Sequence, residues 1–142
     1  MTGYTVRLTD WATDGERLAA VRREVFVREQ RVPEELEWDG ADAACVHAIA
    51  EDVQGRAIGT ARLLPDCSIG RMAVLAAWRG RGVGDTLLRC MLEAARRRGD
   101  AEATLHAQTH ACGFYERHGF RRRGAEFMEA GIPHVGMAKS LR

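Results

Sequence analysis

The sequence has little of what marks membrane, metal-binding or nucleic-acid-binding proteins. No apolar run approaches the ~20 residues that a membrane-spanning helix needs, and residues 2–10 alternate polar and apolar side chains instead of forming the apolar block of a signal peptide. The four cysteines lie far apart, without the paired spacing of metal ligands. A net charge of +1 provides no general attraction to nucleic acid or to membrane surfaces. We therefore expect a cytoplasmic protein that holds no metal and whose partners are neither nucleic acid nor membrane.

The residues that are present suit one globular domain. Of the 142 residues, 46% are hydrophobic and 29% are charged, which allows a buried core and is unlike a disordered chain. A chain of this length is the size of one domain, so we expect residues 1–142 to form a single unit. Arginine is clustered at Arg79 with Arg81, and in the runs 96–98 and 121–123. Such clusters usually lie on solvated faces, and the alternative is an anionic ligand.

The first half of the chain predicts a strand, a helix and three further strands. Tyr4, Val6 and Leu8 alternate in the first strand. Thr13 followed by Glu16 indicates a capping box that opens a helix running to about residue 30. Residues 33–44 are acidic and predicted to be irregular. Strands are expected over 45–51, 57–64 and 67–75, and the short connections between them imply antiparallel pairing.

The second half predicts a helix, a strand, a short helix and one or two closing strands. Its clearest feature is a helix that ends at Gly99 and carries an apolar stripe of Leu87, Leu88, Met91, Leu92 and Ala95. A strand is expected at about 103–107 and a short helix at about 109–118, and the tail from Phe120 returns to the sheet. This order of elements predicts an α/β fold with a mixed sheet whose first half is antiparallel.

A glycine-rich segment, Arg-Gly-Arg-Gly-Val-Gly-Asp over 79–85, joins the fourth predicted strand to the striped helix. Glycines let a ligand approach the main chain closely, and free amides at a helix N-terminus favour an anion. With Arg79 and Arg81 beside them, these residues suit a phosphate or a diphosphate; the simpler interpretation is a flexible turn. The dinucleotide fingerprint does not fit, because the sixth residue counted from Gly80 is Asp85. A P-loop does not fit either, because no lysine with a following Ser or Thr comes after the last glycine of the segment.

The segment resembles the first motif of the GCN5-related N-acetyltransferase (GNAT) superfamily, in which Gln or Arg precedes two spaced small residues, here Arg79, Gly82 and Gly84. A second motif of that superfamily, a helix ending in Phe-Tyr with Gly-Phe after three more residues, matches Ala111, Phe114, Tyr115, Gly119 and Phe120. A narrower resemblance, to the bacterial ElaA/YjcF-like branch, is carried by residues 25–30, 70–74, 105–108 and 129–134. The resemblance implies a mixed, mostly antiparallel central sheet of about 6–7 strands flanked by helices, with strands 4 and 5 splayed.

The resemblance implies that acetyl-coenzyme A is the acyl donor. The main chain of strand 71–74 would bind the pantetheine arm, and the glycine segment the diphosphate. The position of Gln108 is commonly Asn in the superfamily, where it tethers the cofactor chain, and glutamine offers the same amide one methylene further out. The cofactor-binding residues expected in this way are Met72, Ala73, Val74, Arg79, Gly80, Arg81, Gly82, Val83, Gly84, Asp85, Gln108 and Phe114.

Catalysis by direct transfer to an amine requires an oxyanion donor, a general acid and a base. The resemblance implies that an amide near Val74 faces the thioester oxygen and that the hydroxyl of Tyr115 lies near the sulfur as general acid. The base is open among Glu29, His47, His110, Glu129 and His134, with a water relay as a further alternative. Glu29 and His134 are preferred because they lie in the branch pattern. Cys112 is expected to pack against the sheet rather than to act as a nucleophile.

The predicted function is therefore acetyl-coenzyme A-dependent N-acetylation of a primary amine, on a small molecule or a peptide. The main alternative is a domain that binds acyl-coenzyme A as a sensor or scaffold without turnover. Tyr115 and the acidic segment from Glu34 to Asp42 favour catalysis. A nucleic-acid binder is disfavoured by the near-neutral charge. Dimers are common in the superfamily, so a homodimer is an expectation by analogy.

Overall fold

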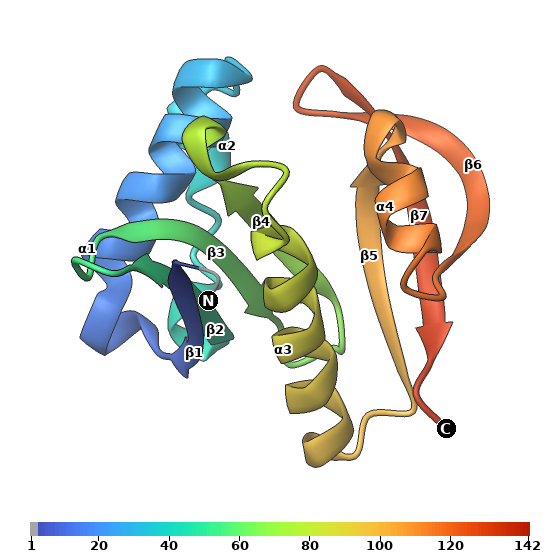
Figure 1. Ribbon diagram of the computed structural model, residues 1–142. Coiled ribbons are helices and arrows are strands. Elements are labelled where there is room, and N and C mark those ends of the chain that lie inside the picture. The colour runs from blue at the N-terminus through green and yellow to red at the C-terminus, as the bar shows by residue number, and fades with distance from the viewer. Residues whose placement is uncertain (1–2) are drawn as a thin grey trace.

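The computed structural model describes residues 3–142 as two antiparallel sheets that diverge from one another (Figure 1). In chain order, its helices, helical turns and strands are β1 (Tyr4–Thr9), α1 (Trp11–Arg22), η1 (Arg23–Glu29), α2 (Glu34–Glu37), η2 (Asp42–Ala44), β2 (Val46–Asp52), β3 (Ala57–Leu63), β4 (Ile69–Val74), η3 (Ala76–Trp78), α3 (Val83–Arg98), β5 (Glu102–Gln108), η4 (Thr109–Ala111), α4 (Cys112–Glu116), β6 (Arg121–Glu129) and β7 (Ile132–Ser140).

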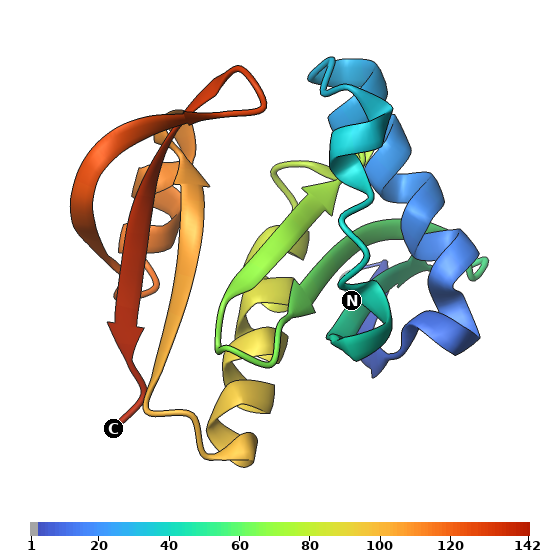
Figure 2. The ribbon, with the colours of Figure 1, turned by 180° about the vertical axis from the view of Figure 1, so that it is seen from behind.

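The two sheets meet at one point and separate from there. One sheet has the strand order β1-β2-β3-β4 and the other β5-β7-β6. Between β4 and β5, the described residues form a single parallel bridge, Ser68 to Thr104, in which the amide of Thr104 donates to the carbonyl of Cys67 at 3.1 Å. Beyond that bridge the strands part, as two opposite views show (Figures 1 and 2). The prediction of a mixed α/β fold with splayed fourth and fifth strands is confirmed.

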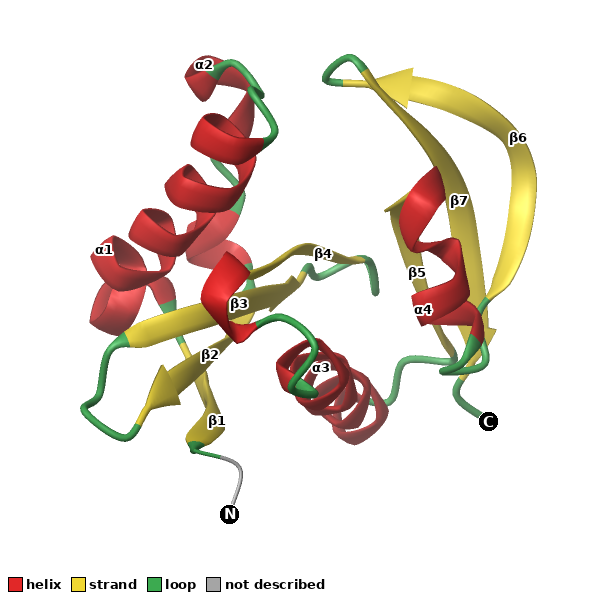
Figure 3. Ribbon diagram, turned by 45° about the horizontal axis from the view of Figure 1, so that its top comes forward, coloured by secondary structure: helices red, strands yellow, loops and turns green. Residues whose placement is uncertain are grey.

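The core lies around the β1–β4 sheet, with α1 on one face and α3 on the other (Figure 3). The predicted stripe of α3 is buried, since none of its five residues is more than 4% exposed. Gly99 ends α3 as predicted, with a φ of 90° that a residue without a side chain adopts readily. Cys112 packs into the same core, as expected. Within residues 3–142, no helix is both long and apolar enough to cross a membrane.

Two local predictions were wrong. The first helix begins at Trp11 rather than at a capping box on Thr13, because the carboxylate of Asp10 accepts a hydrogen bond from the amide of Thr13 at 2.8 Å and so caps the helix earlier. The segment 33–44 is also more regular than expected, since it contains α2 and η2. Its acidic residues contact arginines of the neighbouring elements, and these contacts hold a chain segment whose sequence shows no periodicity.

Candidate functional site

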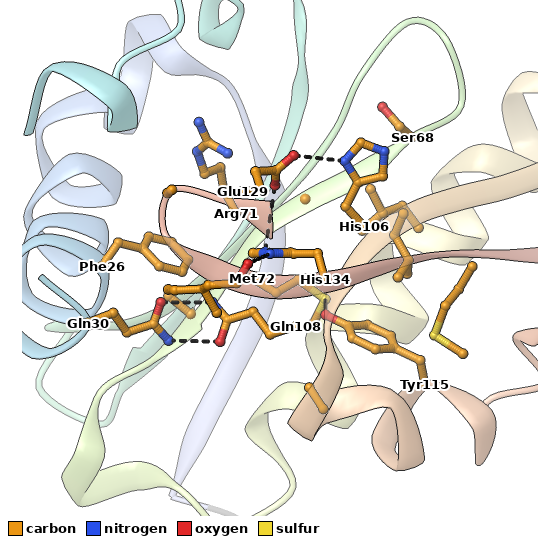
Figure 4. Close-up of a pocket in the computed structure, with 18 of the residues that line it drawn as sticks. Phe26, Gln30, Ser68, Arg71, Met72, His106, Gln108, Tyr115, Glu129 and His134 are labelled. Carbon is orange, nitrogen blue, oxygen red and sulfur yellow. Dashed lines mark hydrogen bonds and ion pairs between the residues drawn. The ribbon is translucent and has the colours of Figure 1, made fainter. Parts of the chain in front are cut away.

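A cleft of about 1290 Å³ opens where the two sheets separate. Its walls come from η1 and α2 on one side, from β4 and β5 at the base, and from α4 and the β6–β7 hairpin on the other side. Figure 4 shows side chains from segments far apart in the sequence pointing into this space. The cleft is large enough for a small-molecule or cofactor site.

The edge of β4 that faces the cleft carries main-chain groups that point away from β3. The amide of Leu75 donates to the carbonyl of Ile58 on β3 at 2.9 Å. Because successive amides of a strand point in opposite directions, the amide of Val74 points away from β3, toward the cleft that Val74 lines. The carbonyl of Val74 accepts a hydrogen bond from Nε of Arg79 at 3.0 Å. This edge can bind an extended ligand through main-chain hydrogen bonds.

The glycine segment forms the start of α3. Gly80 and Gly82 have φ angles of 77° and 84°, which disfavour any residue with a side chain. Gly82 is the N-cap and no side chain caps the helix, so the first amides of α3 are free of the intrahelical partners that later residues have. A Cβ on Gly84 would lie 3.5 Å from the ring of Phe114, so this glycine packs against that ring. Free amides at the start of a 16-residue helix suit an anion such as a diphosphate.

The charged side chains of the glycine segment contact neighbouring side chains. Nη2 of Arg79 lies 2.8 Å from a carboxylate oxygen of Glu29 on η1. The guanidinium of Arg81 stacks on Trp78, 4.7 Å from the ring centroid, and Asp85 contacts Nε2 of His118 at 2.7 Å. Glu29, one of the two preferred bases, therefore lies against the arginine of the glycine segment.

Tyr115 lies on the other wall of the cleft. Its hydroxyl approaches Sδ of Met72 on β4 at 3.8 Å, and its ring makes edge contacts with Phe114 and Phe120. Desolvation by the surrounding protein, with a smaller contribution from Cys112, raises the pKa of Tyr115 to about 12. The hydroxyl is therefore protonated at neutral pH and can donate a hydrogen bond to an atom beside Met72.

An amide pair crosses the cleft between η1 and β5. Nε2 of Gln108 donates to Oε1 of Gln30 at 2.8 Å, and Gln30 donates back at 3.3 Å. His110 also contacts Oε1 of Gln108, at 2.7 Å. The amide that the sequence predicts as a cofactor tether thus lies in the cleft, where it pairs with Gln30 at the end of η1 (Figure 4).

Two histidines and a glutamate gather in the cleft, on the sheet that carries Gln108. Oε1 of Glu129 lies 3.0 Å from Nδ1 of His106, and Oε2 lies 3.6 Å from Nε2 of His134. The register explains the meeting: His134 of β7 pairs with Gln108 on β5 and with Phe127 on β6, so His106 and Glu129, each two residues from those partners, point to the same face. Phe127 stacks on His134 and contacts His106 with its edge.

The acidic segment expected to favour catalysis is largely neutralised. Arg22, which is 1% exposed, contacts Glu37 at 2.8 Å and Asp42 at 2.6 Å. Arg62 binds Asp39 and Asp42 at 2.5 and 3.0 Å. Its hydrogen bond is the main reason why the pKa of Asp39 lies well below its usual range. Most of these carboxylates are thus engaged in the wall of the cleft and are not free to attract a cation.

The structure places some predicted site residues in the cleft and others behind it. Those that line it are Glu29, Met72, Ala73, Val74, Arg79, Gly84, Gln108, Phe114, Tyr115 and His134. Gly80, Arg81, Gly82, Val83 and Asp85 form the adjoining loop and first turn of α3, where Val83 is buried and its amide is the group available to a ligand. Within residues 3–142, no three His, Cys, Asp or Glu side chains are grouped as metal ligands.

Sequence reasoning did not assign a role to the side chains of Gln30, Arg71 or His106. Arg71 lines the cleft with a φ of 49° and contacts Glu37 at 3.0 Å. His106 and Gln108 are two apart on a strand, and this spacing could have placed both side chains on the cleft face. Nothing in the sequence indicates that Gln30 lies opposite Gln108.

Comparison with known proteins agrees with this geometry. The family model described as an acetyltransferase (GNAT) domain matches residues 11–141. The chain is 38% identical over 123 residues to the uncharacterized N-acetyltransferase YjcF of Bacillus subtilis, covering 84% of this chain and 87% of that protein.

Among solved structures, an acyl-CoA N-acyltransferase from Pseudomonas aeruginosa superposes with a TM-score of 0.86 at 31% identity, covering 96% of this chain and 99% of that one. Escherichia coli ElaA superposes with a TM-score of 0.86 at 29% identity, with the same coverage of 96% and 99%. The similarity therefore extends over nearly the whole fold.

Proposed function

Because this chain belongs to the acetyltransferase (GNAT) family, in its ElaA/YjcF-like branch, we propose that residues 1–142 form a single N-acetyltransferase domain that moves an acetyl group from acetyl-coenzyme A directly to a primary amine. Acyl-coenzyme A-dependent acetyl transfer is the activity of the family, and the acceptor and the residue roles are our proposals. The observation that carries them is the continuous path from the glycine segment along β4 to Tyr115 and His134 in one cleft.

The residues of the chain fit the cofactor. The free amides of α3 and the guanidinium of Arg79 would hold the diphosphate, and the open edge of β4 would hold the pantetheine arm. The bound cofactor supplies an activated acetyl thioester. Main-chain donors at Met72 to Val74 would then fix its position, and the Val74 amide would stabilise the oxyanion that forms on the thioester carbonyl.

Tyr115 is proposed as the general acid that faces the leaving sulfur. A thiol has a pKa of ~8.5 by analogy with cysteine, while the pKa of Tyr115 is raised to about 12. Complete proton transfer from Tyr115 to the free thiolate is therefore unfavourable, because the two pKa values differ by about 3.5, which corresponds to about 5 kcal/mol. The hydroxyl contributes mainly by donating a hydrogen bond while charge develops on the sulfur, which is worth about 1.5–3 kcal/mol for a charged acceptor.

Binding and turnover are tested separately. With a dissociation constant near 10 μM, 1 mM acetyl-coenzyme A would stabilise the fold by about 2.7 kcal/mol, a rise of several degrees in melting temperature. A panel of polyamines, amino sugars and peptides would then be screened for thiol release. Binding without release from any amine would favour the sensor; no stabilisation by millimolar cofactor would contradict both functions.

The variant Tyr115→Phe tests the proposed role of Tyr115 as general acid. We expect kcat to fall about 10- to 150-fold, which is the rate equivalent of the lost hydrogen bond, while stabilisation by acetyl-coenzyme A is retained. Equal losses of binding and turnover would assign Tyr115 to cofactor binding instead.

A further inference from the structure

The two ring nitrogens of His134 have different roles. Nδ1 lies 2.7 Å from the carbonyl oxygen of Ile132. A carbonyl can only accept, so Nδ1 carries the hydrogen, and in the neutral ring the lone pair is on Nε2. His134 is 7% exposed, its ring stacks on Phe127 and Nδ1 is held by the Ile132 carbonyl, so the orientation of the ring is fixed. The available basic nitrogen thus faces Glu129.

Glu129 is placed to stabilise this ring once it is charged. Its Oε2 lies 3.6 Å from Nε2 of His134, too far for a hydrogen bond to the neutral ring but close to the position that a new proton would occupy. Its other oxygen contacts Nδ1 of His106 at 3.0 Å, and the side chain of His106 is 60% exposed. Glu129 therefore connects a buried ring to one that is open to solvent.

The carboxylate of Glu129 also differs from others in the cleft. Glu29, Glu37 and Asp39 are each paired with an arginine. Among residues 3–142, Glu129 forms ion pairs with the two histidines alone. A cationic group entering the cleft would therefore meet an uncompensated negative charge at this point.

From these contacts we propose that His134, Glu129 and His106 form the site that receives the acceptor as an ammonium ion and removes its proton. This inference rests on the proposed acetyl transfer. His134 is the catalytic residue, since Nε2 takes the proton, while Glu129 and His106 are positioning residues. Glu129 draws in the cation, stabilises the imidazolium and is itself held by His106.

The proton balance is complete without another reactant. The ammonium loses one proton to Nε2 of His134, and its nitrogen lone pair then forms the N–C bond to the thioester carbonyl. When the C–S bond breaks, its electron pair leaves on sulfur, and the second proton of the acceptor nitrogen is lost as the amide forms. One of these protons is taken up by the sulfur. The other leaves His134 for solvent past Glu129 and His106.

A spectroscopic experiment tests the site without needing an acceptor. Protein with 15N-labelled histidine would be titrated by long-range 1H–15N NMR, as wild type and as Glu129→Gln. We expect the Nδ1–H tautomer for neutral His134, and a titration midpoint about one pH unit lower in the variant, because an opposite charge close to the ring is lost. The other charged or titratable side chains lining the cleft from neighbouring elements are Glu29, Glu37, Asp39, Asp66, Arg62, Arg71, Arg79, His106, His110, Tyr115 and Arg123, and all are kept.

Glu126→Gln, an exposed change on the same strand, is the matched control and should leave the midpoint in place. An Nε2–H tautomer for His134, or equal midpoints in wild type and Glu129→Gln, would overturn the proposal. Both results are independent of turnover, so they are distinguishable from a failure of the acetyltransferase function itself.

A kinetic arm uses n-butylamine, a minimal primary amine, as acceptor. We expect His134→Gln to lower its acetylation about 100-fold, and Glu129→Gln to lower it about tenfold at neutral pH with a shifted pH profile. Stabilisation by acetyl-coenzyme A should be retained in both variants, which also shows that they fold. Unchanged turnover in His134→Gln would remove it as the base.

Discussion

The buried arginine of α1 provides a direct test of how the wall of the cleft that α2 forms is held in place. Replacing Arg22 by Met keeps much of the apolar stem but removes the charge that contacts Glu37 and Asp42, which are 3% and 6% exposed. Breaking a buried pair from one side costs about 3–5 kcal/mol. Because Arg71 and Arg62 remain at 3.0 Å from these carboxylates, we expect the lower end, about 3 kcal/mol.

Urea unfolding followed by far-UV circular dichroism measures this loss. With a slope of about 1.5 kcal/mol/M, the unfolding midpoint should fall by about 2 M. Arg28→Met is the matched control: its pair with Glu24 joins side chains that are 70% and 46% exposed, so we expect a change within about 0.5 kcal/mol. A loss below about 1 kcal/mol in Arg22→Met, at an unchanged slope, would refute the reasoning, because the two carboxylates would then be satisfied without this arginine.

Three further predictions concern the glycine segment, the role of Glu29 and the stability of the protein at low pH. Gly82→Ala and Gly99→Ala both place a side chain on a left-handed residue at an end of α3, so each should cost about 1–2 kcal/mol of stability. Only Gly82→Ala should weaken acetyl-coenzyme A binding in calorimetry, and equal affinities would count against the glycine segment as the binding site. Glu29→Gln should bind the cofactor several-fold more tightly, because Arg79 loses a competing partner; a loss of turnover at unchanged affinity would identify Glu29 as the base. The pKa of Asp39 is held below its ordinary value of 3.8, chiefly by a hydrogen bond from a buried arginine, so its stabilising effect is complete above that value and is lost as the pH falls. The difference in urea midpoint between wild type and Asp39→Asn should therefore start to shrink below about pH 5 and go on shrinking well below about pH 3, and a constant difference would contradict this.

The sequence by itself predicted most of the elements and the glycine segment at the start of α3. The stripe of α3, its stop at Gly99 and the glycine segment before it are all local patterns, because helix periodicity and the torsion angles of glycine depend on residues near in the chain. The same holds for the pairing of β2, β3 and β4, where short connections leave antiparallel pairing as the simple outcome.

The tertiary structure alone decided which residues contact the side chains for which we propose chemical roles. Glu29 carries a carboxylate that could act as a base, but the fold places it against Arg79, 50 residues away in the sequence. Glu129 meets His106 only because β7 lies between β5 and β6. Such contacts depend on strand order and register, and a shift of one residue would turn each side chain to the opposite face. Local spacing carries no information about that register, so the contacts of Glu129 with His106 and His134 could not be predicted from the sequence.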